Sequence, residues 1–298
     1  MLTIFTPTYN RAFSLRKLYD SLKRQTVKDF EWLVCDDGST DNTSEVLSGC
    51  LLEGIVKMRV VYQANGGKHR AINNGVKQAQ GDWFFIVDSD DSLPDDSVAT
   101  VLQHLREIEE NPQFAGIVGN RIYSNGKRIG GEVPYQVLDV DSVSLRQCYH
   151  MKGDLAEVWR TEILKQYPFP EYIGEKFISE SIVWDEIAKK YILRYINCNI
   201  YVCDYLQDGL TCNIRRHHRM SPCGTMAVYS KQMHDKRYSI KARIIAAINY
   251  WRYTISYKGE RKGHLRPTGW AYLFYLAGYC FLKKDVFTEK RSKYQKEK

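Results

Sequence analysis

Three carboxylates follow directly on an apolar segment, in the run Asp88-Ser89-Asp90-Asp91. Like charges this close raise one another's pKa unless a cation neutralises them. One or two carboxylates together with substrate phosphate oxygens are the usual ligands of a hard divalent metal. An Asp-rich helix cap before Leu93–Asp96 is the alternative, because Asp is a good N-cap residue. The position after a Trp-Phe-Phe-Ile-Val segment favours the metal site.

Two roles fit a second acidic run, Asp36-Asp37-Gly38-Ser39-Thr40-Asp41. Ser39 to Asp41 can cap the following helix, which is the ordinary interpretation. Asp36 and Asp37 precede that cap, so capping does not account for both. A carboxylate here can accept a hydrogen bond from a nucleobase N–H, and Tyr9 of a neighbouring loop offers a stacking face.

The glycine pair in Asn65-Gly66-Gly67 lets the backbone approach a ligand closely, although many such pairs only mark turns. Lys68 and Arg70, which come directly afterwards, can reach a ribose or a phosphate.

The elements that position these residues are predicted from the apolar spacing. Strands and helices alternate over the first 90 or so residues, which indicates βαβ units and a largely parallel sheet. Ligands of such sheets bind beyond the carboxyl ends of the strands, where all of these loops fall. The expected strands are 2–6, 31–35, 59–62 and 83–87, and the expected helices are 11–24, 41–47, 68–78 and 95–110.

Beyond Pro112 the pattern changes. Asn125-Gly126 predicts a hairpin between 114–123 and 127–129. The later segments predict a helix over 179–191, strands at 192–196 and 200–205, and basic, aromatic helices from residue 211 onward.

The charge is distributed unevenly along the 298 residues. Residues 211–298 hold 20 basic and 5 acidic residues, a net charge of +15, whereas residues 1–210 carry −7. This asymmetry suggests an anionic partner, namely phosphate groups, a membrane surface or nucleic acid. The overall composition, 44% hydrophobic and 26% charged, excludes disorder, collagen and coiled coil.

A cytoplasmic location is expected. Met1 leads directly into Leu-Thr-Ile-Phe, which lacks the pattern of a secretory signal, and the eight cysteines form no C-x-x-C pair. The apolar run 270–282 is 13 residues long, too short to span a bilayer, and predicts a core or interfacial helix.

Four segments occur in order along the chain: Thr6–Arg11, Asp36–Asp41, Asn65–Gly67 and Asp88–Asp91. Together they resemble the N-terminal half of a family 2 glycosyltransferase over about residues 1–125. The resemblance implies an α/β GT-A fold, with a Rossmann-like, mixed but mostly parallel central sheet and flanking helices, here followed by a C-terminal helical extension. It implies a UDP- or GDP-linked sugar donor, Mg²⁺ or Mn²⁺, and transfer with inversion at the anomeric carbon.

The same resemblance assigns roles to single residues. Pro7, Tyr9 and Asp37 would hold the base. Asp88 and Asp90 match a D-x-D motif, in which the first reaches ribose or the metal and the second binds the metal. The full set expected to bind the nucleotide-sugar is Pro7, Tyr9, Asn10, Asp36, Asp37, Asn65, Gly67, Lys68, Asp88 and Ser89.

The catalytic base is expected at the start of the 179–191 helix. An inverting transfer needs a carboxylate that takes the proton of the acceptor hydroxyl. In the family this base usually lies in a Glu-Asp pair. Glu180 fits the first position of that pair, whereas Ser181 stands where the family often has Asp. Glu180 is the predicted base, with Asp185 in reserve, and helix capping by Glu180 is the alternative.

A dense basic run at Arg215–Arg219 offers a contact to the diphosphate. Arg215, Arg216 and His217 are the expected residues, in a loop that closes over the nucleotide, and a solvated loop is the alternative.

Three regions are expected along the chain: 1–125 binds the nucleotide-sugar, 126–210 binds the acceptor, and 211–298 forms the basic extension. The acceptor is expected to be a glycan or a lipid-linked glycan of a bacterial surface polysaccharide. The extension either packs as a helical subdomain or makes a peripheral contact with the inner face of the cell membrane. A non-catalytic nucleic-acid or glycan binder is the competing function, but the chain has no recognised nucleic-acid reader motif, so no nucleic acid is expected.

Overall fold

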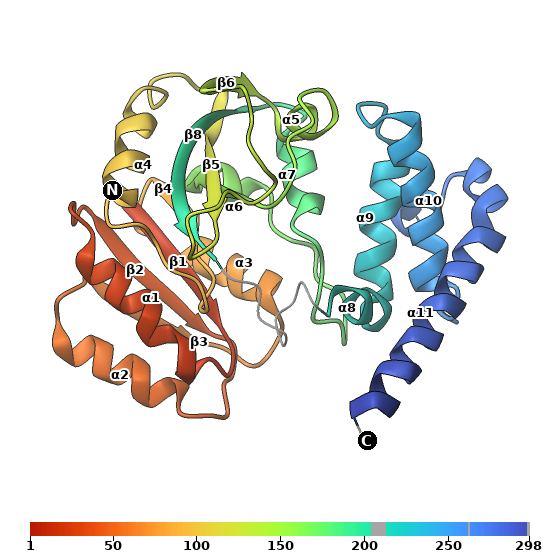
Figure 1. The fold of residues 1–298 in the computed structure, drawn as a ribbon, viewed down its shortest axis with the longest axis horizontal. Helices are drawn as coiled ribbons and strands as arrows, with labels where there is room; N and C mark the ends of the chain where they lie inside the picture. Colours follow the sequence, from red (N-terminus) through yellow and green to blue (C-terminus); the bar gives the residue numbers. More distant parts are fainter. Residues whose placement is uncertain (204–212, 262, 297–298) are drawn as a thin grey trace. The chain divides into compact units, whose positions relative to one another are not determined.

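The computed structural model describes residues 1–203, 213–261 and 263–296 (Figure 1). The chain forms two compact units. The first comprises residues 1–169 and 183–206, and the second comprises residues 170–182 and 207–298. The three regions predicted from the sequence concern which ligand each part binds, and they remain predictions.

The first unit is built on one mixed eight-stranded sheet with the order β3-β2-β1-β4-β7-β5-β8-β6. β3, β2, β1 and β4 are parallel, β7 is antiparallel to both of its neighbours, β5 and β8 are parallel, and β6 is antiparallel to β8. The strands are β1 Leu2–Thr8, β2 Phe30–Asp36, β3 Met58–Tyr62, β4 Trp83–Ile86, β5 Phe114–Ile122, β6 Val137–Val140, β7 Leu155–Arg160 and β8 Ile192–Val202.

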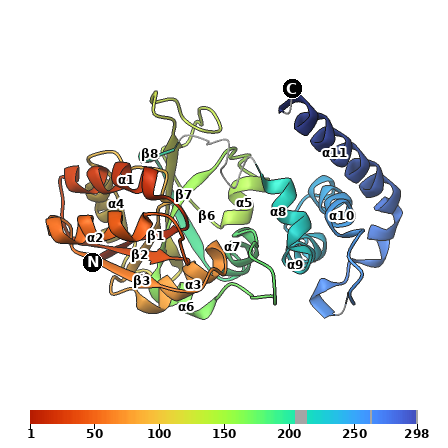
Figure 2. The ribbon, with the colours of Figure 1, turned by 90° about the horizontal axis from the view of Figure 1, so that it is seen from below.

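Helices cover both faces of this sheet (Figure 2). Apolar residues of α1, α2 and α4 join the strand side chains of one face in a single buried core, which includes Trp32 and Phe85. α3 packs on the other face, where Gly75 lies against the ring of Phe5 and permits the close approach. The helices are α1 Ala12–Arg24, α2 Thr43–Glu53, α3 Lys68–Gln78, α4 Ser97–Arg106, α5 Ser142–Gln147, α6 Thr161–Gln166 and α7 Ser181–Ile187.

The mixed α/β class and the strand–helix alternation predicted from the sequence are confirmed. Several details differ. The helix expected over 41–47 continues to Glu53 as α2. The two strands expected over 192–205 are one continuous strand, β8, and the expected helix 179–191 is helical only over Ser181–Ile187. The predicted hairpin is reduced to a turn with one bridge, between Ile122 and Arg128, because β5 pairs with β7 and β8 instead.

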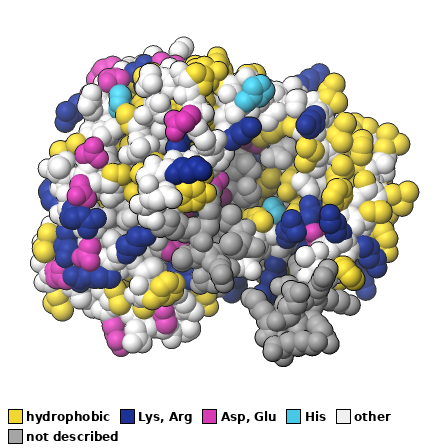
Figure 3. Space-filling view, viewed as in Figure 1, with side chains coloured by type: hydrophobic (Ala, Val, Ile, Leu, Met, Phe, Trp, Pro, Cys, Tyr) yellow, Lys and Arg dark blue, Asp and Glu magenta, His cyan; other side chains and the backbone are white. Residues whose placement is uncertain are grey.

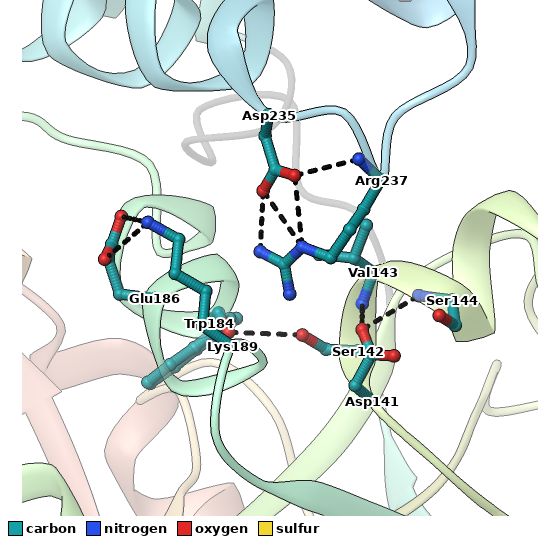
Figure 4. A network of polar contacts seen from close by, with 9 residues as sticks. All are labelled: Asp141, Ser142, Val143, Ser144, Trp184, Glu186, Lys189, Asp235 and Arg237. Atoms are coloured by element: carbon teal, nitrogen blue, oxygen red, sulfur yellow. Dashed lines mark hydrogen bonds and ion pairs between the residues drawn. The ribbon is translucent and has the colours of Figure 1, made fainter.

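α5 is held at its start by polar contacts (Figure 4). Asp141 Oδ1 accepts the backbone N–H groups of Val143 and Ser144, at 3.0 and 3.1 Å, which makes it a regular N-cap. Ser142 Oγ donates to the carbonyl of Trp184 at 3.2 Å and so joins α5 to α7.

Helices make up most of the described part of the second unit, and an irregular segment over residues 170–180 precedes α7. Met226, Tyr250 and Trp251 are central to its core, and the indole of Trp251 donates to the carbonyl of Ala271 at 2.8 Å. The apolar run 270–282, predicted as one helix, is divided between a 3₁₀ turn and an α-helix. Within the described residues no helix has the length and apolar character that a bilayer crossing requires. The elements are α8 Ile214–Met220, α9 Pro222–His234, α10 Ile240–Thr254, η1 Gly263–Leu265, η2 Gly269–Phe274 and α11 Tyr275–Lys296.

Candidate functional site

The four chemistry-bearing loops leave the sheet at one edge. β1, β2, β3 and β4 run in the same direction, with Thr8 opposite Asp36 and Asp36 opposite Tyr62. β4 ends at Ile86, opposite Phe5 of β1. Since the carboxyl ends of parallel strands share an edge, the structure brings the four loops together, as the strand pattern predicts.

The loop after β1 is fastened to the loop after β2 around Asn10. Asn10 has a left-handed backbone with φ +51°, and its N–H donates to Ser39 Oγ at 2.9 Å. Its side-chain oxygen accepts the N–H of Thr40 at 2.8 Å. Pro7 is buried within β1, whereas Tyr9 is 46% exposed. Asn10 therefore shapes the loop, and the ring of Tyr9 is accessible to a ligand.

Asp37 binds the glycine loop. Its two carboxylate oxygens accept the backbone N–H groups of Gly66 and Gly67, at 2.8 and 2.7 Å. The side-chain amides of Gln63 and Asn65 also donate to this carboxylate, at 2.8 and 3.3 Å. Asp37 is 4% exposed, so these contacts provide the hydrogen bonds that a buried carboxylate requires. Sequence reasoning missed this positioning role.

Gly38 allows the second and third loops to meet. Its φ is +75°, and a Cβ at this position would lie 2.9 Å from the backbone nitrogen of Asn65 and 3.2 Å from the carbonyl oxygen of Gln63. Asp36 is buried beside it and accepts the N–H of Ser39 at 2.9 Å. Both acidic residues of this run thus organise the local backbone.

The third loop leads into α3. Gly67 has φ +95°, and its carbonyl accepts the N–H groups of Arg70 and Ala71 at 3.0 and 3.2 Å, which starts the helix. Lys68 lies in the first turn, and its ammonium forms an ion pair with Asp88 Oδ1 at 2.7 Å. The glycine loop is therefore tied to the acidic loop as well as to Asp37.

Cations surround the acidic loop. Besides Lys68, the guanidinium of Arg121 lies 3.9 Å from Asp88 Oδ2, and Arg11 Nε lies 4.0 Å from Asp90 Oδ2. The side chains of Asp88 and Asp90 are 26% and 20% exposed. Both carboxylates are thus partly sheltered yet still open to a ligand.

These surroundings shift the pKa values of the three carboxyl groups in different directions. Burial opposes ionisation of Asp88, but the positive charges of Lys68 and Arg121 outweigh it and lower the pKa. Burial, together with the negative charge of Asp88, raises the pKa of Asp90. The same two causes raise the pKa of Asp91 to about 7. Three close carboxyl groups therefore do not carry equal charge.

Tyr201, near the end of β8, holds the acidic loop in shape. Its hydroxyl donates to Asp91 Oδ2 at 2.7 Å and accepts the backbone N–H of Asp88 at 2.9 Å. The guanidinium carbon of Arg121 lies 4.1 Å from the centre of the Tyr201 ring. One buried phenol therefore connects two of the three acidic residues and supports the arginine beside them.

Arg11, Arg121 and Tyr201 were not predicted from the sequence. Arg121 and Tyr201 lie near the carboxyl ends of β5 and β8, which run parallel to each other. The rule that ligands bind beyond strand ends would have found them only if the pairing of β5 and β8 with the rest of the sheet had been known.

The acidic loop fits a hard divalent cation with few protein ligands. Asp88 and Asp90 supply carboxylate oxygens, the ligand type that Mg²⁺ and Mn²⁺ prefer. Within the described residues no group of three or more His, Cys, Asp or Glu is arranged to hold a metal. Mg²⁺ is usually held by one or two carboxylates with substrate phosphates rather than by a full protein cage, so the donor set fits an ion completed by a ligand.

The sequence matches the family described as "Glycosyl transferase family 2" over residues 3–159, more than half of the chain. The chain belongs to glycosyl transferase family 2. The matched range contains all four loops and ends within β7.

Curated relatives of this family 2 chain cover only part of it. The GalNAc(5)-diNAcBac-PP-undecaprenol beta-1,3-glucosyltransferase of Campylobacter jejuni is 26% identical over 197 residues, 63% of this chain and 60% of that protein. The chondroitin synthase of Pasteurella multocida is 39% identical over 103 residues, 35% of this chain and 11% of that protein. The chain thus spans less than two thirds of the length of either relative.

Solved structures share the fold. Staphylococcus aureus TarS 1–349 in complex with UDP-GlcNAc has a TM-score of 0.57 at 17% identity, covering 86% of this chain and 73% of that chain. The mannosyltransferase PcManGT of Pyrobaculum calidifontis, with GDP-Man and Mn²⁺, has a TM-score of 0.55 at 18% identity, covering 96% and 84%. The GT-A fold expected from the resemblance is confirmed.

The two candidate bases of this family 2 protein flank the start of α7. Glu180 directly precedes the helix and Asp185 lies within it, and both are partly buried. The boundary between the two units falls between Ile182 and Val183, so Glu180 belongs to the second unit and Asp185 to the first. Their roles, including the capping alternative for Glu180, stay predictions.

The basic run predicted as a loop forms helix α8. Arg215 Nη1 lies 3.4 Å from Asp285 Oδ1 of α11, within the second unit. His217 lies 5.6 Å from the ring of Phe177, and burial followed by the charge of Arg216 lowers its pKa. The contact of Arg215, Arg216 and His217 with a diphosphate stays a prediction.

A depression of about 430 Å³ lies at the opposite edge of the sheet. Its lining includes Met1, Asp29 and Asp82, which precede β1, β2 and β4. None of the predicted site residues lines it, and it lies away from the carboxyl ends where α/β sheets bind ligands.

Proposed function

We propose that this protein is an inverting glycosyltransferase that moves a sugar from a UDP- or GDP-linked donor to a glycan or lipid-linked acceptor, assisted by Mg²⁺ or Mn²⁺. The observation that carries the proposal is the meeting of the Asp88–Asp91 loop with the Asp37-bound glycine loop at one sheet edge. The nucleotide-sugars named with TarS and PcManGT, and the undecaprenol-linked acceptor named for the Campylobacter relative, support these substrate classes.

In this proposal the donor lies across the carboxyl edge of the sheet. The exposed ring of Tyr9 stacks on the base, with Pro7 and Asp37 beside it. Because Asp37 already accepts the N–H groups of Gly66 and Gly67, its contact with the base is shared with the loop. Lys68, in the first turn of α3, lies where the helix dipole also favours a negatively charged phosphate.

Asp88 and Asp90 would hold the metal ion, which would supply positive charge to stabilise the departing diphosphate. Glu180, with Asp185 in reserve, takes the proton of the acceptor hydroxyl as the hydroxyl oxygen bonds to the anomeric carbon. The bond from that carbon to the diphosphate oxygen breaks on the opposite face, so the configuration inverts. Arg215, Arg216 and His217 contribute further positive charge toward the diphosphate.

Thermal unfolding with nucleotides tests the donor site. UDP or GDP should raise the melting temperature of the full chain more in the presence of Mn²⁺ than in its absence. Asp90→Ala should abolish that metal-dependent increase. Asp29→Ala, an exposed aspartate at the other end of β2, is the matched control and should leave it unchanged. Stabilisation by an oligonucleotide, but by neither nucleoside diphosphate, would instead favour the non-catalytic binder.

The reaction itself is tested by a donor screen that measures nucleoside diphosphate release. With the donor found, Glu180→Gln should lower kcat by roughly a hundredfold or more, while Asp185→Asn should have a smaller effect. Proton NMR of the product reports the anomeric configuration. Retention of the donor configuration would rule out the inverting mechanism, and a reversed order of the two variants would move the base to Asp185.

A further inference from the structure

In η2 and in the part of α11 whose side chains the structure describes, residues 275–288, one face is packed and the opposite face is exposed. On the packed side Gly278 lies so close to Trp251 that a Cβ would come within 2.4 Å of its Cβ. Asp285, 3% exposed, accepts two hydrogen bonds of 2.7 Å from Arg252. Since residues 278 and 285 point inward, the helical repeat places 276, 280, 283 and 287 on the outer side.

Large apolar side chains occupy that outer side. Leu273, Leu276 and Phe287 are 82%, 74% and 69% exposed. Figure 3 shows apolar and basic side chains next to one another on the part of the surface formed by the second unit. We call the following set the η2–α11 face: Leu273, Leu276, Tyr279, Lys283, Lys284 and Phe287.

The chemistry of this face fits an anionic lipid surface. Contiguous exposed apolar residues mark an interaction site, and Leu, Phe and Tyr beside Lys are typical of helices lying in a membrane interface. The ammonium of Lys283 lies 5.2 Å from the centre of the Tyr279 ring, so cation and aromatic ring are presented together. Tyrosine suits the membrane interface because its ring is apolar and its hydroxyl can remain hydrated.

The charge of this region favours an anionic membrane over a second copy of the chain, and the exposed apolar residues favour it over nucleic acid. Residues 211–298 carry a net charge of +15, which repels a second copy of the chain and attracts anionic headgroups. Nucleic acid would meet the lysines but gains little from burying Leu273 or Leu276.

We propose that the η2–α11 face docks this protein on an anionic membrane, with Leu273, Leu276 and Phe287 at the acyl boundary and Lys283 and Lys284 among the headgroups. This proposal narrows the membrane contact expected for residues 211–298 to one surface. It does not rest on the donor chemistry, so liposome binding and nucleotide binding can succeed or fail separately.

Co-sedimentation of the full chain with vesicles tests the proposal. Vesicles of phosphatidylcholine with phosphatidylglycerol should bind the protein at low ionic strength, and both pure phosphatidylcholine and about 0.5 M salt should release it. The double variant Leu276→Glu/Phe287→Glu should lower the partition coefficient roughly tenfold or more. Lys283→Glu/Lys284→Glu should lower it to a similar extent through charge alone.

Leu52→Glu is the matched control, because Leu52 of α2 is 88% exposed and lies outside this face. It should bind vesicles like the unchanged protein. Melting temperatures of the variants with UDP or GDP and Mn²⁺ show that the fold and the donor site are retained. The proposal is overturned if the unchanged protein stays in the supernatant, or if both double variants still sediment with the vesicles. It is equally overturned if the unchanged protein is dimeric and Leu276→Glu/Phe287→Glu makes it monomeric without changing vesicle binding.

Discussion

The hydroxyl of Tyr201 donates a 2.7 Å hydrogen bond to the carboxylate of Asp91 although 110 residues separate them. The same oxygen accepts the N–H of Asp88 at 2.9 Å. Backbone bonds between Ser92 and Val202, at 3.0 and 2.9 Å, continue the connection. The acidic loop is therefore attached to the end of β8, and the spacing of its carboxylates depends on that strand.

Tyr201→Phe should remove the hydrogen bonds that hold the acidic loop in shape, without altering any predicted ligand of the metal. The lost hydroxyl leaves a buried N–H and a carboxyl group unsatisfied, at a cost of about 1–3 kcal/mol in stability. Affinity for the nucleoside diphosphate with Mn²⁺ should fall roughly tenfold or more, as is usual for residues that orient metal ligands. Calorimetric titration measures the affinity.

Tyr195→Phe is the control for this prediction. Tyr195 lies on the same strand and is fully buried, and its hydroxyl donates to Asn120 at 2.9 Å. It should lose comparable stability but retain the Mn²⁺-dependent affinity. Equal losses of affinity in both variants would show that Tyr201 supports the fold in general rather than the acidic loop.

Asp37→Asn should disrupt the glycine loop. Asparagine has the same shape but replaces one acceptor by an N–H₂ group, which then faces the N–H of Gly66 or Gly67. We expect a loss of about 3 kcal/mol in the free energy of unfolding, measured with urea, and loss of nucleotide binding. Gln63→Met removes one of the four donors to the Asp37 side chain together with the acceptor for the Asn74 amide, and should cost less, about 1–2 kcal/mol. An Asp37→Asn protein as stable as Gln63→Met would contradict this account.

Gly38→Ala should destabilise more than Gly54→Ala. Both glycines have positive φ, +75° and +62°, so each alanine carries a backbone strain of about 1–2 kcal/mol. Only at Gly38 would the new Cβ also meet backbone, 2.9 Å from the nitrogen of Asn65, whereas the space at Gly54 is open. Urea denaturation of both variants should show the larger loss for Gly38→Ala, and nucleotide affinity should fall only there.

Stability should decrease with acid because of His218. Burial, then the charges of His217 and Arg252, lower the pKa of His218 to about 4, below the ordinary 6.5. Protonation is thus easier in the unfolded chain, so the stabilising contribution is complete above about pH 6.5 and is lost between about pH 6.5 and 4. The loss should reach about 3 kcal/mol.

His218→Phe tests this contribution, because phenylalanine can keep the stacking on Tyr253 while removing the titrating group. Its free energy of unfolding should vary less between pH 7 and 4, by about 3 kcal/mol, than that of the unchanged protein. His234→Gln serves as the matched histidine control. A pH profile that is the same for the unchanged protein and His218→Phe would refute the assignment.

Much of the fold could be predicted because local patterns specify it. The apolar spacing located β1 to β4 and α1 to α4, although α2 continues to Glu53, six residues beyond its predicted end. The order of these elements placed Tyr9, Asp37, Lys68 and Asp88 on one edge. The hairpin at Asn125-Gly126 was less accurate, because the turn signal is local while the pairing of β5 is decided by β7 and β8.

Local periodicity and turn chemistry by themselves determined the strand–helix alternation, the four loops and the basic character of residues 211–298. Only the tertiary structure decided that β7 separates β4 from β5 and that Tyr201 meets Asp91. It also showed that Asp37 binds a loop 29 residues further on and that one face of α11 is exposed over residues 275–288. These contacts join residues far apart in the chain, and no spacing within one sequence specifies which distant strands will pair.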